Sequence, residues 1–335
     1  MEEGNVVNKV TVSAPGKLML FGEHAVVYDH PCLVTAVDQR MRATVEVLET
    51  SEFELEAPDV DVSGYKKPLS ELGQGDIPKG AKFVEIAVKN IYEKFGLDKG
   101  IRVTTSSEFS SKFGFGSSSA STVCVVKALS ELFGLKLSNK QIFDLAYKTV
   151  LDIQGKGSGF DVAAAVFGGT VYFVTGGKTI EPLTINNLPL IVGYSGIKAD
   201  TVTLINQVKE KFADNDDRLQ EIYAEMETIV EKAKPFVISG DWESVGSLMN
   251  ENQKLLKELG VSIEKLDNMI SGAIEAGAYG AKLSGAGGGD CMIALGPDNK
   301  RQNIGKGIEA AGGEIISVKT NAEGVRVEND QSNNS

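Results

Sequence analysis

Gly114-Phe-Gly-Ser-Ser-Ser-Ala-Ser121 lies between a predicted strand and a predicted helix, and it constrains the architecture more than any other segment. The strand covers residues 101–105, and apolar side chains at helical spacing follow the loop up to Gly134. Glycines let a backbone approach a ligand closely. The first turn of a helix presents unpaired N–H groups to an anion, and serine hydroxyls can bind a phosphate oxygen or a magnesium ion. The segment therefore predicts a phosphate-binding loop.

The same loop has a second interpretation. It matches neither GxxxxGK[ST] nor GxGxxG, the two familiar nucleotide-binding patterns in which glycines precede a helix. A serine-capped helix after a flexible turn explains the residues equally well.

A second glycine-rich loop, Ser284-Gly-Ala-Gly-Gly-Gly-Asp290, precedes a predicted strand over residues 290–295. Because four of its seven residues are glycine, we expect the backbone to pack closely against the first loop, a ligand or another chain. A tight entry into the strand is the alternative.

Strands and helices alternate around the first loop, as in an α/β or α+β domain, and long amphipathic helical patterns predominate after residue 186. Pro15 and Gly16 predict a turn ahead of Lys17. We predict strands over residues 10–12, 42–48, 101–105, 170–174, 188–194, 290–295, 314–319 and 324–327. We predict helices over residues 82–95, from the first loop to 134, 139–151, 162–167, 201–212, 218–238, 242–259 and 262–276.

Composition limits the classes of partner. The 335 residues carry a net charge of −12 and are 42% hydrophobic, which is typical of a globular protein and a poor match for nucleic acid. No segment approaches the ~18 apolar residues of a membrane span, and the acidic N-terminus does not resemble a signal peptide. We therefore expect a cytoplasmic protein. Three scattered cysteines predict buried thiols, and two histidines exclude a multi-histidine metal site.

Three segments together resemble the galactokinase, homoserine kinase, mevalonate kinase and phosphomevalonate kinase (GHMP kinase) superfamily. They are Ala14-Pro-Gly-Lys-Leu-Met-Leu-Phe-Gly-Glu-His-Ala-Val-Val27, the Gly114 loop, and Lys282-Leu-Ser-Gly-Ala-Gly-Gly-Gly-Asp-Cys291. The resemblance covers about residues 8–327 and implies a two-domain α+β fold that holds ATP and substrate between the domains. The expected domains are a ribosomal protein S5 domain 2-like unit over 1–185 and a ferredoxin-like unit over 186–327, with a disordered tail over 328–335.

The resemblance leaves two acceptors open. The first motif and residues 248–261 are similar to mevalonate kinases, which implies phosphorylation of the 5-hydroxyl of mevalonate for isoprenoid synthesis. Residues 112–118, 154–162 and 200–205 and the Gly-Asp-Cys ending at Cys291 are similar to phosphomevalonate kinases. We favour mevalonate. A nucleotide-binding regulator without catalysis is a third hypothesis, and a homodimer is left open.

Asp161 and Lys17 are the predicted catalytic residues. A carboxylate that accepts or orients the acceptor hydroxyl proton is what phosphoryl transfer requires of a protein, and the resemblance places Asp161 in that role. It pairs Lys17 with this aspartate or with the transferred phosphate. The alternatives are a helix-capping Asp161 and a solvated Lys17 after the predicted turn.

The nucleotide and metal ligands are predicted from the glycine loops. The predicted ATP and phosphate ligands are Lys112, Gly114, Gly116, Ser117, Ser118, Ser119, Gly285 and Gly287, and Ser118 is also the predicted ligand of Mg²⁺. Mevalonate kinases supply a second metal ligand, a glutamate, eleven residues before the catalytic aspartate, where this sequence has Val150. The nearest acid, Asp152, is interpreted as a surface residue, so the metal is expected to rely on serine, water and ATP oxygens.

The predicted substrate-binding residues are Glu23, His24, Thr201 and Ser284. For Glu23, His24 and Thr201 the assignment comes from the resemblance to substrate-contacting positions of mevalonate kinases. A satisfied structural histidine is the alternative for His24. An exposed loop lysine is the alternative for Lys112, which could otherwise bind a phosphate of ATP or of phosphomevalonate.

Overall fold

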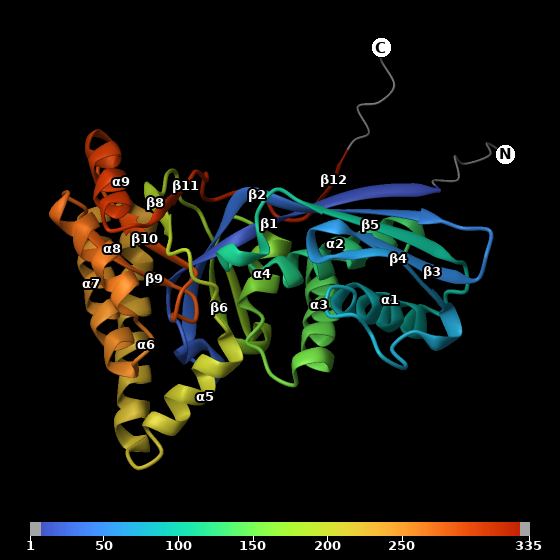
Figure 1. The fold of residues 1–335 in the computed structure, drawn as a ribbon, viewed down its shortest axis with the longest axis horizontal. Helices are drawn as coiled ribbons and strands as arrows, with labels where there is room; N and C mark the ends of the chain where they lie inside the picture. The colour runs from blue at the N-terminus through green and yellow to red at the C-terminus, as the bar shows by residue number, and fades with distance from the viewer. Residues whose placement is uncertain (1–7, 329–335) are drawn as a thin grey trace.

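A computed structural model describes residues 8–328 and places their strands in two sheets (Figure 1). The strands are β1 (Lys9–Phe21), β2 (Pro31–Val47), β3 (Glu52–Ala57), β4 (Val62–Pro68), β5 (Ile101–Ser107), β6 (Thr170–Val174), β7 (Thr179–Leu183), β8 (Leu190–Tyr194), β9 (Gly280–Ser284), β10 (Cys291–Leu295), β11 (Glu314–Ile316) and β12 (Arg326–Val327). The α-helices are α1 (Lys82–Phe95), α2 (Ser117–Leu132), α3 (Asn139–Gln154), α4 (Phe160–Phe167), α5 (Thr201–Lys211), α6 (Asp216–Ser239), α7 (Trp242–Leu259), α8 (Glu264–Glu275) and α9 (Arg301–Ala310).

The first sheet has eight strands in the order β12-β1-β2-β5-β3-β4, and β6 and β7 extend it from the first half of β2. Helix α2 packs on β1 and β2, α4 packs on β1, β2 and β6, and α1 and α3 pack on α2. In Figure 1 these helices lie together on one side of the sheet. Helix α2 is buried on nearly all sides from Ser119 to Ser130, because it separates the sheet from two other helices. This burial fixes the position of the loop that precedes it.

The second sheet has four strands in the order β11-β8-β10-β9. Helices α7 and α8 pack on β9, α9 packs on β8 and β11, and α6 packs on α7. These helices form a separate group at the other end of the molecule in Figure 1. The two-domain α+β fold predicted from the sequence is confirmed. The predicted division at residue 185 falls between β7 and β8.

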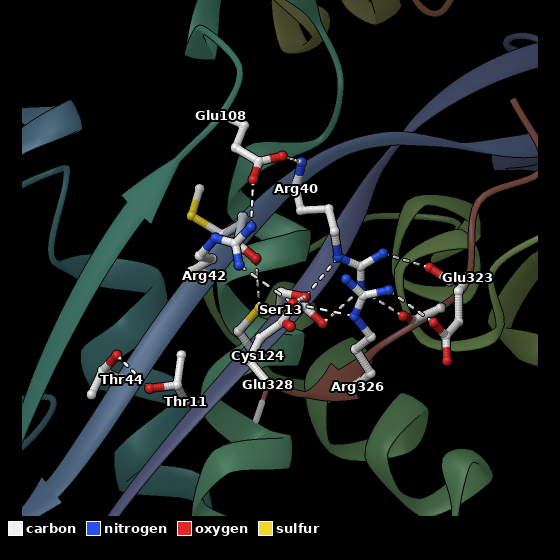
Figure 2. Close-up of polar contacts among 12 residues, drawn as sticks. Thr11, Ser13, Arg40, Arg42, Thr44, Glu108, Cys124, Glu323, Arg326 and Glu328 are labelled. Carbon is white, nitrogen blue, oxygen red and sulfur yellow. Dashed lines mark hydrogen bonds and ion pairs between the residues drawn. The ribbon is translucent and has the colours of Figure 1, made fainter. Parts of the chain in front are cut away.

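The chain returns to the first sheet after leaving the second. Strand β12 pairs with β1, and Arg40, which is 5% exposed, holds the preceding residues (Figure 2). Its guanidinium donates to the carbonyls of Glu323 and Gly324 over 2.8 and 2.7 Å and to the Ser13 hydroxyl over 2.6 Å. The Glu328 carboxylate accepts from that hydroxyl over 2.5 Å. The rest of the predicted tail, 329–335, lies outside the described residues.

Local patterns located most elements. Helices α1 and α7 and strand β6 begin and end where the sequence predicts. The predicted turn at Pro15 and Gly16 is wrong, because β1 continues through both residues with only a shift in register against β2. Lys17 therefore lies within a strand. Strands β3, β4, β7 and β9 and helix α9 were not predicted.

All three cysteines, Cys32, Cys124 and Cys291, are buried free thiols, as predicted. Among the helices of residues 8–328, none combines the length and the apolar character that a bilayer crossing requires.

Candidate active site

The Gly114 loop turns the chain from β5 into α2. A short 3-10 helix, η4 (Ser111–Phe113), leads to Gly114 and Gly116, whose φ angles are 72° and 80°. Glycine is the residue that adopts this left-handed backbone without steric cost. Gly116 is the N-cap of α2, and no side chain of the described chain caps this helix. The serine-capped alternative is therefore wrong. The N–H groups of the first turn are left for an anion.

The three loop serines differ in burial. Ser117 is half-buried, Ser118 is exposed and Ser119 is buried. The backbone oxygen of Ser118 accepts from the hydroxyls of Ser121 and Thr122 over 2.9 and 2.8 Å. Ser118 therefore presents its own hydroxyl at the surface of the loop, as a ligand to a phosphate or a metal would.

Lys17 reaches the loop from β1. The residue is 8% exposed, and its ammonium donates to the Gly114 carbonyl over 2.8 Å and lies 5.2 Å from the Phe160 ring centre. Burial lowers the pKa of Lys17 below its ordinary value of 10.5, while the nearby charges of Asp161 and Asp290 raise it. The alternative of a solvated lysine is wrong, since the side chain is enclosed and directed at the loop.

Asp161 lies in the first turn of α4, and the N-cap of that helix is Gly159. Asp161 is therefore not the N-cap residue of this helix, although its carboxylate contacts a first-turn N–H. One carboxylate oxygen accepts from the Ser119 hydroxyl over 2.6 Å, and the other accepts from the Val162 N–H over 3.0 Å. Ser119 thus fixes the direction of the carboxylate.

Gly116 separates the two predicted catalytic residues. A methyl group built on Gly116 would lie 3.4 Å from Cε of Lys17 and 3.5 Å from Cβ of Asp161. Lys17 and Asp161 form no direct ion pair within 4 Å among the pairs of the described chain. A cation and a carboxylate therefore flank the first turn of α2 without a direct ion pair, an arrangement that can act on a phosphate and a hydroxyl brought together there.

The glycines of the second loop have different neighbours. Gly285 has a φ of 102°, and a methyl group on it would meet nothing within 4 Å. Gly287 packs against Val261, whose carbonyl oxygen would be 2.2 Å from such a methyl group. Gly285 therefore borders open space, where a ligand can approach, whereas Gly287 is required for packing.

His24 bridges to this loop from the turn after β1. It is 6% exposed, has a φ of 61°, and its Nε2 lies 2.8 Å from the Ala286 carbonyl oxygen. Because a carbonyl only accepts, Nε2 is the donor. Burial lowers the pKa of His24 below 6.5, so the ring is neutral at pH 7 and Nδ1 is an acceptor.

Glu23 and Ser284 connect the two halves of the molecule. The Glu23 carboxylate pairs with the fully buried ammonium of Lys282, and Asn252 donates to its other oxygen over 3.1 Å. The Ser284 hydroxyl donates to the Met19 carbonyl over 3.0 Å and accepts from the Met19 N–H over 2.9 Å. Both predicted substrate residues are thus occupied by protein partners.

Two other predicted residues lie on the surface. Thr201 begins α5 and is exposed, and Lys112 is exposed in η4. Asp152 is exposed on α3, pairs with Lys148 over 2.5 Å and accepts from Asn90, which confirms its interpretation as a surface helix residue. Within 8–328, no cluster of three or more acidic, histidine or cysteine side chains could hold a metal ion.

Sequence reasoning missed four residues that support the site: Lys198, Asn252, Lys282 and Asp290. Lys282 and Asp290 belong to the third motif, but the residues that bind them come from segments distant in the sequence. Asn252 faces Glu23 from α7. One signal was available in the sequence. A lysine and an asparagine stand at strand or helix positions where buried apolar residues are expected.

Comparison with known proteins identifies the family. The model for the GHMP kinases N terminal domain matches residues 82–169, and the model for the GHMP kinases C terminal matches 231–313. The mevalonate kinases of Thermococcus sibiricus and Pyrococcus furiosus are 35% and 36% identical to this chain, and each alignment covers 96% of this chain and 98% of the relative. The crystal structure of the Methanococcus jannaschii mevalonate kinase is similar with a TM-score of 0.80 and 26% identity, over 95% of this chain and 99% of that one.

Proposed function

Because the chain belongs to the GHMP kinase family, a family of ATP-dependent kinases, we propose that it transfers the γ-phosphoryl group of ATP to the 5-hydroxyl of mevalonate. One observation carries the catalytic assignment: Lys17 and Asp161 flank Gly116 at the uncapped start of α2. The acceptor is supported by the full-length relatives, which are mevalonate kinases.

The loop holds the polyphosphate in this proposal. The first-turn N–H groups of α2 and the hydroxyls of Ser117 and Ser118 bind phosphate oxygens. Gly114 and Gly285 let the nucleotide approach the backbone. These neutral donors suit an acidic chain, because its net charge of −12 gives no general attraction for ATP.

Asp161 and Lys17 act on the reacting groups. Asp161 accepts or orients the proton of the 5-hydroxyl, and the Ser119 hydroxyl keeps its carboxylate in place. Lys17 stabilises the negative charge on the γ-phosphoryl group as it is transferred, in a buried setting where charge interactions are strong.

The exposed Ser118 hydroxyl fits a Mg²⁺ ion that arrives with ATP, since this hard cation keeps several waters and binds phosphate oxygens with few protein ligands. The bound ion would neutralise charge on the phosphates. His24 would accept a hydrogen bond from mevalonate through Nδ1. Glu23 and Ser284 position the turn and the loop around His24, and Thr201 lies at the rim.

Phosphomevalonate is the second candidate acceptor. Its additional ~2 negative charges at neutral pH require cationic partners. Lys112 and Lys198 are exposed beside the loop, and the Lys198 ammonium donates to the Ser111 carbonyl. Both lysines favour this alternative.

A coupled assay of ATP consumption decides between the acceptors. We expect turnover with mevalonate and none with phosphomevalonate, homoserine or galactose. Turnover with phosphomevalonate and not with mevalonate would contradict the proposal. The homodimer and the cytoplasmic location stay predictions, which light scattering and cell fractionation test.

A further inference from the structure

Asp290 connects the second glycine loop to the segment after β8. Its N–H donates to the Ile197 carbonyl over 2.7 Å, and its carbonyl accepts from the Ser195 N–H over 2.9 Å. Its carboxylate accepts from the Ala199 N–H over 3.0 Å. The side chain is 14% exposed and the φ angle is 53°, a conformation that aspartate and asparagine tolerate better than most residues. Asp290 is therefore held in one position by three hydrogen bonds.

The same carboxylate lies against the phosphate loop. A methyl group on Gly114 would be 2.5 Å from Oδ2 of Asp290, so a larger residue there would displace the carboxylate or the turn. Lys198 lies beside it, with its ammonium 3.6 Å from Oδ1 of Asp290 and donating to the Ser111 carbonyl over 2.9 Å. The second half of the molecule thus contacts both ends of the turn over residues 111–114.

That turn also positions the catalytic lysine. The Gly114 carbonyl accepts from the Lys17 ammonium over 2.8 Å, and the Phe115 carbonyl accepts from the Lys17 N–H over 3.0 Å. A displacement of residues 111–115 would therefore move Lys17 relative to Asp161. A loop with two left-handed glycines loses much conformational entropy when it is ordered, so it needs external contacts to hold one shape.

We propose that Lys198 and Asp290 form a clamp that holds the turn 111–114 in its nucleotide-binding shape and thereby positions Lys17. The inference rests on the proposed function for the role of Lys17, and it adds two positioning residues to the site. The clamp joins the two halves of the molecule at the phosphate loop, so it couples their relative position to ATP binding.

Nucleotide affinity is the first test, because it needs no acceptor. We expect Lys198→Ala and Asp290→Asn each to raise the Kd for a non-hydrolysable Mg·ATP analogue about tenfold. Lys198→Arg keeps the cation and should restore most of the affinity. Lys140→Ala is the matched control, since Lys140 is similarly exposed and forms an ion pair with Asp144 away from the loop.

A double variant distinguishes a clamp from two independent effects. If both residues act through one contact, the double variant Lys198→Ala/Asp290→Asn should have a Kd for the analogue no higher than that of the single variant with the higher Kd. Single-variant Kd values within twofold of the parent, or losses that multiply in the double variant, would overturn the proposal. Thermal unfolding of each variant checks that the fold is intact.

The pH profile provides a readout that simple structural support would not change. The titratable groups near Lys17 are Asp161 on α4, Asp290 and Lys198 from the two loops, and the buried Cys291 thiol on β10. Because Asp290 raises and Lys198 lowers the pKa of Lys17, loss of each charge alone would move the alkaline limb of kcat/KM to lower pH in Asp290→Asn and to higher pH in Lys198→Ala. If both residues instead hold the turn whose Gly114 carbonyl accepts from Lys17, either variant displaces Lys17 relative to Asp161, and the limb should move in the same direction in both. Opposite shifts, or none, would contradict the clamp. If the parent protein binds the nucleotide normally but does not turn over mevalonate, only the proposed function is contradicted.

Discussion

Asp161 illustrates how one neighbour can decide the role of a residue. Its carboxylate is half-buried and accepts from Ser119 over 2.6 Å. This leaves it anchored by a residue of the phosphate loop itself.

Replacing Asp161 should separate catalysis from binding. We expect Asp161→Asn to lower kcat about 10²- to 10⁴-fold, because the amide cannot accept the hydroxyl proton. The Kd for Mg·ATP should stay within about twofold, since the loop N–H groups are unchanged. Steady-state kinetics and analogue binding measure the two quantities.

Asp152→Asn is the control for this change, because Asp152 is a nearby acid that pairs with Lys148 on α3. It should leave kcat unaffected. Normal turnover by Asp161→Asn would show that the catalytic assignment is wrong.

Lys17 should control the alkaline limit of activity. Burial lowers the pKa of Lys17 below 10.5, so the ammonium loses its proton at a lower pH than an exposed lysine does. Catalysis needs the charged form, and kcat/KM should therefore fall as pH rises through that pKa. A pH–rate profile from pH 6 to about 10.5 measures the limb.

Lys17→Arg provides the comparison, because a guanidinium stays charged in this range. The variant should be slower but should lack the alkaline limb. A limb at the same pH in both proteins would assign it to another group.

At the scale of elements, the phosphate loop depends on the space around its glycines as well as on their backbone angles. Gly114 and Gly134 have φ angles of 72° and 62°. A methyl group on Gly114 would collide with Asp290, whereas one on Gly134 would meet nothing within 4 Å. The two positions therefore separate backbone strain from steric collision.

Gly114→Ala should weaken nucleotide binding, and Gly134→Ala should not. Each alanine in the left-handed region costs about 1 kcal/mol of unfolding free energy. Only the first should displace Asp290 and the turn 111–114. Urea unfolding and analogue Kd values measured on both variants test this, and equal Kd values would argue that the loop tolerates the collision.

At the scale of the whole molecule, a buried ion pair joins the two halves. Glu23 and Lys282 are 1% and 0% exposed, and Glu23 immediately precedes His24. Burial lowers the pKa of Lys282, and the Glu23 charge raises it. The pair therefore fixes the turn that holds His24 against the second glycine loop.

Replacing one member of this pair should destabilise the protein more than replacing both. Glu23→Gln or Lys282→Met alone leaves one buried charge without a partner and should cost about 3–5 kcal/mol of unfolding free energy. The double variant removes both charges and should recover most of that loss. Denaturant unfolding at pH 7 measures the three values, and additive losses in the double variant would argue against direct coupling.

Local sequence patterns were sufficient to predict many helices and strands and the Gly114 loop. The Lys82–Phe95 and Trp242–Leu259 helices have a clear apolar face and a following Gly96 or Gly260 in the left-handed conformation, features that act within a few residues. The glycines and serines of residues 114–119 likewise indicate a phosphate loop from neighbouring residues alone. The strand through Pro15 and Gly16 was not predictable, because pairing with β2 overrides the local turn preference.

The sequence by itself determined the family and the two-domain α+β fold and predicted the roles of Lys17, Asp161 and the Gly114 loop, because these follow from local periodicity and from motifs in order along the chain. Only the tertiary structure decided what each side chain contacts. Glu23 meets Lys282 across 259 positions of sequence, and Lys198 meets Ser111 across 87. Such contacts depend on how the two halves pack, which no local pattern encodes. The division between groups that face a ligand and groups that hold the loops is therefore a property of the folded chain.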